Sequence, residues 1–307
     1  MCGRFTLTAS RRALLEAFRW VEEAPAPAPR YNICPTQPVL ALVEDAQGRP
    51  QWRWLRWGLI PAWARDVGKG PPLINARCET VDRQPAFRGL LRHRRCLIPA
   101  DGFYEWQAVP GRPKQPWYFR VRALSGTEPG TTPETDPATE PPTPEAKPPL
   151  PPSPQQAESR PPATQRRLFP EPPDEHRPAP EPGSRQPAEP TAGSTTAAST
   201  AGAPPGAVFA LAGLWDTWLG PDGSELDSCV VLTTRPNELV EPIHHRMPVI
   251  LATADHRRWL GRGDLPPAER ERLFRPFPAA AMVAWKVGRG VGTPKRDDPR
   301  CIEPWLE

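Results

Sequence analysis

One stretch of the chain, residues 126–206, limits more than any other feature what the sequence can fold into. It holds 23 of the 48 prolines in this 307-residue chain, one aromatic residue (Phe169), and no Val, Ile or Trp. Such a segment cannot bury enough apolar surface to offset the entropy that ordering would cost. We therefore expect it to be disordered, and we expect the rest of the chain, which holds all 12 tryptophans, to supply the folded core.

The position of this stretch predicts an insertion inside one domain. It falls between two strand-like segments, 117–122 and 208–214, and the part that follows it has few strands of its own. Because loop-closure entropy grows only slowly with length, one domain can carry such an insertion. We expect residues 1–125 and 207–307 to form the two parts of a single domain and 126–206 to be a solvated spacer. A polyproline II docking site for a partner is the alternative.

The apolar patterns elsewhere predict mostly strands. Residues 8–20 have helical spacing, with Thr8 or Ser10 as the cap, and helical patterns return at 255–260 and 266–274. Short apolar or alternating runs bounded by Pro and Gly predict strands at 38–43, 51–57, 73–80, 95–98, 102–107, 117–122, 208–214, 228–233 and 248–251. With no repeat and no βαβ rhythm, the pattern indicates an α+β fold: one β-rich, barrel-like domain with a few helices.

Charge and cysteine usage narrow the class of protein. Outside 126–206 the chain carries 33 basic and 24 acidic side chains, a net charge of +9, which favours a polyanionic partner such as nucleic acid, although surplus arginine is also common on ordinary surfaces. The six cysteines form no C-x-x-C pair and no zinc-like cluster, so we expect neither a metal nor a cofactor. No signal peptide or membrane-spanning run is present, which indicates a soluble, cytoplasmic protein without a membrane partner.

Cys2 is the first candidate for chemistry. Removal of Met1 would leave it with an α-amine of pKa about 8 beside a thiol of pKa about 8.5. Such a 1,2-aminothiol captures aldehydes: the amine forms a Schiff base and the thiol closes a thiazolidine ring. On position alone, a small residue at a frayed chain end is the more common explanation.

Three further segments carry candidate groups. Asn75 and Arg77 are two residues apart in a strand-like run and so share one face of a sheet. Glu105 lies among aromatic residues, which predicts a raised pKa and proton exchange near pH 7, with a salt bridge to an arginine as the alternative. His244 and His245 supply imidazoles, although paired histidines are often surface or core residues.

Taken together, these residues resemble the SRAP family, the SOS response-associated peptidases or abasic-site processing proteins. The matching motifs occur in the family's order over nearly all of the residues expected to fold. They are Met-Cys-Gly-Arg-Phe at the start, Arg30-Tyr31-Asn32 with Pro35, Trp57-Gly58-Leu59-Ile60-Pro61 with Trp63, Asn75-Ala76-Arg77 with Glu79-Thr80, Arg95-Cys96 with Pro99-Ala100-Asp101-Gly102-Phe103-Tyr104-Glu105-Trp106, and Ile243-His244 with Arg246-Met247-Pro248.

The resemblance implies a domain that binds single-stranded DNA, crosslinks covalently to abasic sites through Cys2 and shields the lesion in the DNA damage (SOS) response. Asn75 is similar to the residue that orients the nucleophile, and Glu105 and His244 to its acid–base groups. The implied DNA contacts are Arg4, Arg77 and Arg246 for phosphates, Pro35 and Trp63 in the channel, and, less firmly, Thr233. We expect a nucleoid-associated monomer, with replication-fork proteins as candidate partners. Cys34 departs from the family pattern, which usually has Ala there.

Three other functions use the same features. An N-terminal-nucleophile amidotransferase also begins Met-Cys-Gly, but the chain contains no Asn-Gly dipeptide of the kind its oxyanion motif needs. A cysteine peptidase, including self-cleavage of the leader Met1, is the activity in the family's name. A non-catalytic module that binds Pro-rich partners would not need Cys2.

Overall fold

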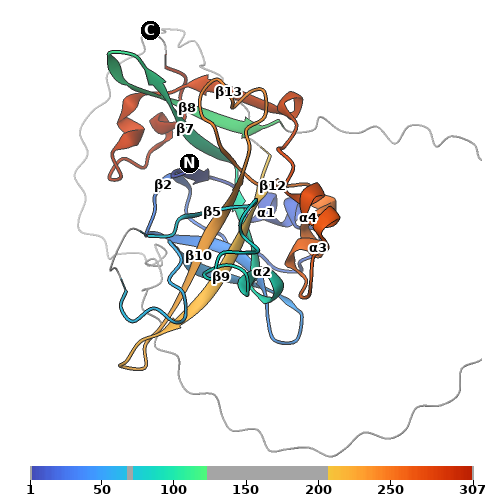
Figure 1. The fold of residues 1–307 in the computed structure, drawn as a ribbon. Helices are drawn as coiled ribbons and strands as arrows, with labels where there is room; N and C mark the ends of the chain where they lie inside the picture. Colours follow the sequence, from blue (N-terminus) through green and yellow to red (C-terminus); the bar gives the residue numbers. More distant parts are fainter. Residues whose placement is uncertain (1, 68–71, 123–206, 306–307) are drawn as a thin grey trace, which may run out of the picture. The chain divides into compact units, whose positions relative to one another are not determined.

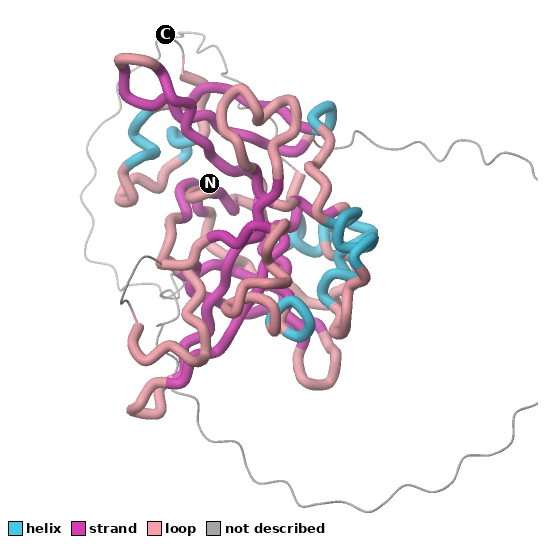
Figure 2. Tube along the Cα trace, viewed as in Figure 1, coloured by secondary structure: helices cyan, strands magenta, loops and turns pink. Residues whose placement is uncertain are grey.

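The computed structural model describes residues 2–67, 72–122 and 207–305, so the predicted insertion at 126–206 lies outside the described residues. Two sheets account for the described strands (Figures 1 and 2). The larger sheet runs β11-β10-β4-β3-β6-β9-β12, and β10 also pairs with β9. This second pairing closes a five-stranded barrel of β3 (Pro38–Glu44), β4 (Pro50–Trp57), β6 (Arg95–Ala100), β9 (Phe209–Leu219) and β10 (Glu225–Thr234).

Three short strands extend the barrel at its edges. The strand β5 (Asn75–Arg77) runs parallel to β10, as β4 does, and places Asn75 opposite Val231. The strands β11 (Met247–Pro248) and β12 (Ile250–Leu251) pair antiparallel with β10 and β9. The end of β10 is therefore flanked by β5 and by the segment that leads into β11.

The second sheet has five strands in the order β13-β8-β7-β1-β2. Their bounds are β1 (Phe5–Leu7), β2 (Arg30–Ile33), β7 (Gly102–Val109), β8 (Arg112–Val121) and β13 (Met282–Lys286). The chain passes from the barrel into this sheet at Asp101, between β6 and β7. The Asp101 carboxylate accepts hydrogen bonds from Thr6 Oγ1 at 2.5 Å and from Thr8 N and Oγ1 at 2.6 Å, which fixes β1 beside this junction.

The described helices are short. They are α1 (Arg11–Ala17), α2 (Leu90–His93), α3 (His256–Leu260) and α4 (Pro267–Leu273), with 3-10 turns η1 (Thr253–Asp255), η2 (Ala279–Ala281), η3 (Arg289–Gly292) and η4 (Pro299–Cys301). In Figure 1, α1, α3 and α4 lie on one side of the barrel. Their apolar residues Leu14, Trp259 and Leu273 are buried in the same core as the barrel strands. None of the helices among the described residues is long and apolar enough to cross a membrane.

The predicted β-rich, barrel-like fold with few helices is confirmed, and Ser10 caps α1 by accepting a hydrogen bond from Ala13 N. The strand predicted at 73–80 is wrong in length, because the chain turns directly after Arg77: Thr80 N donates to Arg77 O. The prediction missed β1, β2, α2 and β13. It also made β9 and β10 too short, since their shared hairpin continues out to Leu219 and Glu225.

Candidate active site

The pairing of β1 with β7 brings Cys2 to Glu105. Phe5 lies opposite Phe103, and Tyr104 N donates to Arg4 O at 3.0 Å, so the residues before Arg4 run beside Glu105. The Cys2 side chain is fully buried, and its Sγ lies 3.9 Å from Arg4 O. Cys2 is thus a packed residue at a defined position and not part of a frayed end.

Asn75 holds the same residue from the barrel side. Its Nδ2 donates to Cys2 O at 2.8 Å, and its Oδ1 is buried with no hydrogen-bond partner among the described residues. Because β5 is pinned to β10, this contact ties the N-terminal segment of one sheet to the barrel. The structure therefore brings Cys2, Asn75 and Glu105 together.

Glu105 is a buried carboxyl group, 2% exposed. Burial raises its pKa to about 7, so that both protonation states are populated at neutral pH. Burial also raises the pKa of the Cys2 thiol, and the neighbouring Glu105 carboxylate adds to this effect. The pair therefore holds a protonated thiol beside a group that can accept its proton.

His244 completes the cluster from the segment between β10 and β11. Its Nδ1 lies 3.7 Å from Glu105 Oε1 and accepts a hydrogen bond from Arg246 N at 3.1 Å. Burial lowers the pKa of His244, which favours the neutral ring. Arg246 O lies 3.0 Å from the same Nδ1, so this nitrogen accepts from the amide in one tautomer and donates to the carbonyl in the other.

Arg246 and Thr233 are engaged within the protein. The Arg246 guanidinium forms a two-point ion pair with Glu79, Nη1 to Oε1 at 2.7 Å and Nη2 to Oε2 at 3.0 Å. Its Nη2 also donates to Thr233 O and, at 3.3 Å, to Thr233 Oγ1. Both Arg246 and Thr233 are buried, so in this structure Arg246 faces a carboxylate where the resemblance implies a phosphate.

The other expected DNA contacts lie around this cluster. Arg77 is exposed at the end of β5, whereas Arg4 is half-buried with Nη1 donating to Gly3 O at 2.9 Å. Pro35 is half-buried in the turn after β2. Trp63 is 71% exposed.

The loop that carries Trp63 is fixed against the β9–β10 hairpin. Ala62 N donates to Asp216 Oδ2 at 3.0 Å, and Trp218 Nε1 donates to Ala64 O at 2.7 Å. These bonds on either side of Trp63 hold the loop in place while the indole faces outward. An exposed aromatic ring on a fixed loop is suited to stacking against a flat partner.

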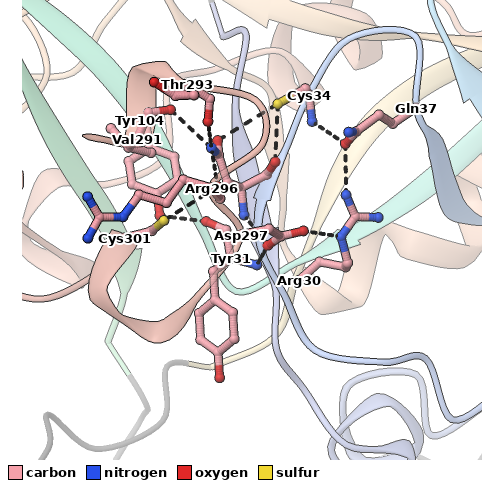
Figure 3. Close-up of polar contacts among 11 residues, drawn as sticks. Arg30, Tyr31, Cys34, Gln37, Tyr104, Val291, Thr293, Arg296, Asp297 and Cys301 are labelled. Carbon is pink, nitrogen blue, oxygen red and sulfur yellow. Dashed lines mark hydrogen bonds and ion pairs between the residues drawn. The ribbon is translucent and has the colours of Figure 1, made fainter. Parts of the chain in front are cut away.

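Cys34 lies in a separate polar network (Figure 3). Its Sγ donates to Asn32 O at 3.2 Å, and burial raises the pKa of its thiol. In the same network Asp297 accepts hydrogen bonds from Arg30 Nε and from the backbone of Tyr31 and Asn32. This arrangement connects β2 to the C-terminal segment and is structural in character.

No set of three or more His, Cys, Asp or Glu side chains within the described part of the chain could hold a metal ion. The sequence motifs indicated no role for Glu79 or Asn32. Both stand in the motifs quoted above, but only the fold shows that they pair with residues more than 160 positions away.

The chain belongs to the SOS response associated peptidase (SRAP) family, whose pattern it matches over residues 1–139 and 184–294. It is 30% identical to the abasic site processing protein YoqW of Bacillus subtilis, over 99% of both chains. It is 26% identical to the abasic site processing protein HMCES of Gallus gallus, over 81% of this chain and 56% of that one. A solved structure from Bacteroides thetaiotaomicron shares the fold, with a TM-score of 0.62 at 20% identity, covering 99% of this chain and 100% of that one.

Proposed function

We propose that this protein binds single-stranded DNA at abasic sites and forms a covalent thiazolidine crosslink through Cys2 once Met1 has been removed. One observation carries the proposal: Asn75 holds the Cys2 carbonyl at 2.8 Å, while the thiol is buried beside Glu105. The relatives named abasic site processing proteins support it.

The proposed reaction balances without an oxidant or reductant. The abasic site opens to an aldehyde, and the α-amine of Cys2 adds to its carbon to form a carbinolamine. Loss of water gives an imine. The thiol then adds to the imine carbon, its proton passes to the nitrogen, and the five-membered ring closes, so that one water is released overall.

Glu105 and His244 divide the proton transfers in this scheme. His244, once protonated by solvent, gives its proton to the sugar ring oxygen as the ring opens and is left as the neutral imidazole that burial favours. Glu105, with a pKa of about 7, passes a proton to the leaving hydroxyl of the carbinolamine and accepts the thiol proton afterwards. General acid–base groups of this kind contribute about 10²–10⁴-fold in rate, so they set the speed and not the identity of the product.

DNA would be held by the groups around the cluster. Arg77 and Arg4 are proposed to neutralise phosphates, Trp63 to stack on a base, and Pro35 to line the channel beside them. In this scheme Thr233 and Arg246 form the floor of the pocket. The positive charge of the residues outside 126–206 supports a polyanionic partner.

The deciding experiment is incubation of the Met1-free protein with single-stranded DNA that contains one abasic site, followed by denaturing electrophoresis and mass spectrometry. We expect a stable adduct of the mass of protein plus DNA minus one water. Cys2→Ser should give only a labile imine that borohydride traps. Retention of Met1 should abolish the stable adduct, and Cys34→Ala, the matched thiol control, should leave it unchanged. A stable adduct in Cys2→Ser, or one mapped to Cys34 or a lysine, would overturn the mechanism.

A peptidase or amidotransferase activity of the same Cys2 is the second candidate, because the family's description includes the word peptidase. Burial works against it, since it raises the pKa of the Cys2 thiol and disfavours the thiolate nucleophile that such enzymes use. Hydrolysis of glutamine or of peptides by the wild-type protein, lost in Cys2→Ser, would establish this activity instead.

A further inference from the structure

Glu79 has no role in the scheme above, although it forms a two-point ion pair with Arg246, two residues after His244. We propose that Glu79 is a positioning residue: through Arg246 it fixes the ring orientation and tautomer of His244. This inference rests on the proposed function of His244, and it concerns a residue that itself touches no reacting atom.

The backbone around Glu79 is held in a fixed position. It lies in the turn after β5, where Cys78 N donates to Thr233 O at 3.0 Å and Thr80 N donates to Arg77 O at 3.1 Å. The turn is thus pinned to the end of β10. The Glu79 side chain is 50% exposed, whereas that of Arg246 is 11% exposed, so the carboxylate covers the guanidinium from the solvent side.

The Arg246 guanidinium is held by Glu79 and by the end of β10. Both Glu79 oxygens contact it in parallel, and the end of β10 contributes Thr233 O and Oγ1. A two-point Arg–carboxylate contact fixes the orientation of the guanidinium as well as its distance from the carboxylate. The backbone of Arg246 is therefore anchored through its own side chain.

The backbone of Arg246 contacts the imidazole ring of His244. Arg246 N donates to His244 Nδ1 at 3.1 Å, and Arg246 O lies 3.0 Å from the same nitrogen. In the neutral ring Nδ1 either accepts from this amide or donates to this carbonyl, and in both cases its partner is the Arg246 backbone. If Arg246 shifts, both contacts to the ring shift with it.

Among the described residues, three further groups lie near His244. Glu105 Oε1 is 3.7 Å from Nδ1, the His245 ring centroid is 4.4 Å away, and Lys114 acts only through its charge. Asn75 and Glu79 lie at the two ends of one short segment, β5 and its turn. That segment therefore positions the nucleophile at one end and the imidazole at the other.

The test uses Glu79→Ala and Glu79→Gln in the full chain. The matched control is Glu269→Ala, because Glu269 makes a similar two-point contact with Arg258, on α3 and α4 and outside the site. The first readout is ¹⁵N NMR of His244 in the DNA-free protein. We expect a single tautomer in the wild type and in Glu269→Ala. In Glu79→Ala we expect mixed tautomers.

The second readout is single-turnover adduct formation. We expect Glu79→Ala to be about 10- to 100-fold slower with an adduct of unchanged mass, because small misplacement of a catalytic group has effects of this size. Glu79→Gln keeps one acceptor oxygen, so its rate of adduct formation should lie between those of Glu79→Ala and the wild type. If Glu79→Ala does not fold, the Glu79→Gln variant provides the test.

Two results would overturn the inference. One is an unchanged His244 tautomer in a folded Glu79→Ala. The other is faster adduct formation with tighter DNA binding, which would mean that Glu79 competes with phosphate for Arg246. The NMR readout needs no DNA, so a wild-type protein that forms no adduct would refute the proposed function separately from this inference.

Discussion

At the scale of single residues, Glu105 shows how burial sets chemistry. Its aromatic neighbours in the sequence predict a raised pKa, and in the structure burial raises that pKa to about 7 from an ordinary 4.5. Only the family resemblance implied that Cys2 and His244 share a site with Glu105, because these contacts depend on the pairing of β1 with β7 and on a segment about 140 residues away.

A raised carboxyl pKa has a consequence for stability. Between pH 4.5 and 7 the folded protein keeps a proton on Glu105 that the unfolded chain has lost, so stability falls as pH rises through this window. Glu105→Gln removes this penalty. We expect the variant to gain about 2–3 kcal/mol relative to wild type on going from pH 5 to pH 8, at about 1.4 kcal/mol per pKa unit. Denaturant unfolding of both proteins at pH 5 and pH 8 measures this gain. A difference in unfolding free energy that is the same at both pH values would contradict the prediction.

Arg77 is the arginine at the site that is best placed to meet a phosphate. It is exposed and makes no ion pair with another described residue, whereas Arg246 is committed to Glu79. We expect Arg77→Ala to weaken binding to single-stranded DNA and to reduce the salt slope of log K by about 0.7, the value for one phosphate contact. Fluorescence anisotropy across salt concentrations checks this. Arg12→Ala, on the exposed face of α1, serves as the control and should leave the slope unchanged.

At the scale of elements, the strand pattern was predictable where strands are locally apolar. The strands predicted at 38–43, 51–57 and 95–98 correspond to β3, β4 and β6, which all lie in the barrel. The strands β1 and β2 have only three and four residues; β1 pairs with β7 and β2, and the β2 backbone also donates hydrogen bonds to Asp297 in the C-terminal segment. Such short strands carry no periodicity, so the sequence alone could not reveal them.

The Asn32 side chain gives the clearest example of a strand, β2, that is held by a distant segment. It is fully buried, and its Nδ2 donates to the carbonyls of Val291, Thr293 and Arg296 at 2.7–3.1 Å. Asn32→Ala would leave the Val291 carbonyl without this donor and would remove one of two donors to the carbonyls of Thr293 and Arg296. We expect a loss of about 2–4 kcal/mol in the free energy of unfolding.

This loss should be accompanied by early proteolytic cleavage within residues 288–298, because Asn32 fastens that segment. Limited proteolysis with mass spectrometry locates the cut. Ser10→Ala, which removes only the cap of α1, is the control and should cost about 1 kcal/mol without changing the cleavage site. Unchanged cleavage in Asn32→Ala would show that other contacts, such as those of Asp297 and of the buried Val291, are enough to hold the segment.

At the scale of the whole molecule, strands from both sides of residues 126–206 share each sheet. In the barrel, β9 and β10 join β3, β4 and β6, and in the other sheet β13 pairs with β8. This interleaving supports our proposal that 1–125 and 207–307 are two parts of one domain. Neither part can complete the barrel without the other, since its closure requires the pairings of β10 with β4 and of β9 with β6.

The register places the last described residues before 126–206 and the first ones after it close together. Phe119 of β8 lies opposite Phe103, which places Val121 near Asp101, and Phe209 of β9 lies opposite Ala100. Neighbouring strands are about 4.8 Å apart, so both ends of the connection lie beside the β6–β7 junction, about 10–15 Å from each other. Twelve Gly/Ser residues reach about 40 Å and span this gap easily.

We therefore expect replacement of 126–206 by a 12-residue Gly/Ser loop to leave the fold and adduct formation intact. The shorter loop should raise the free energy of unfolding by about 1–2 kcal/mol, because loop-closure entropy scales with the logarithm of loop length. Denaturant unfolding and single-turnover adduct formation check the two halves of this prediction. Loss of cooperative unfolding would show that the segment contributes to the core. Slower adduct formation in a protein of unchanged stability would show instead that it assists DNA binding.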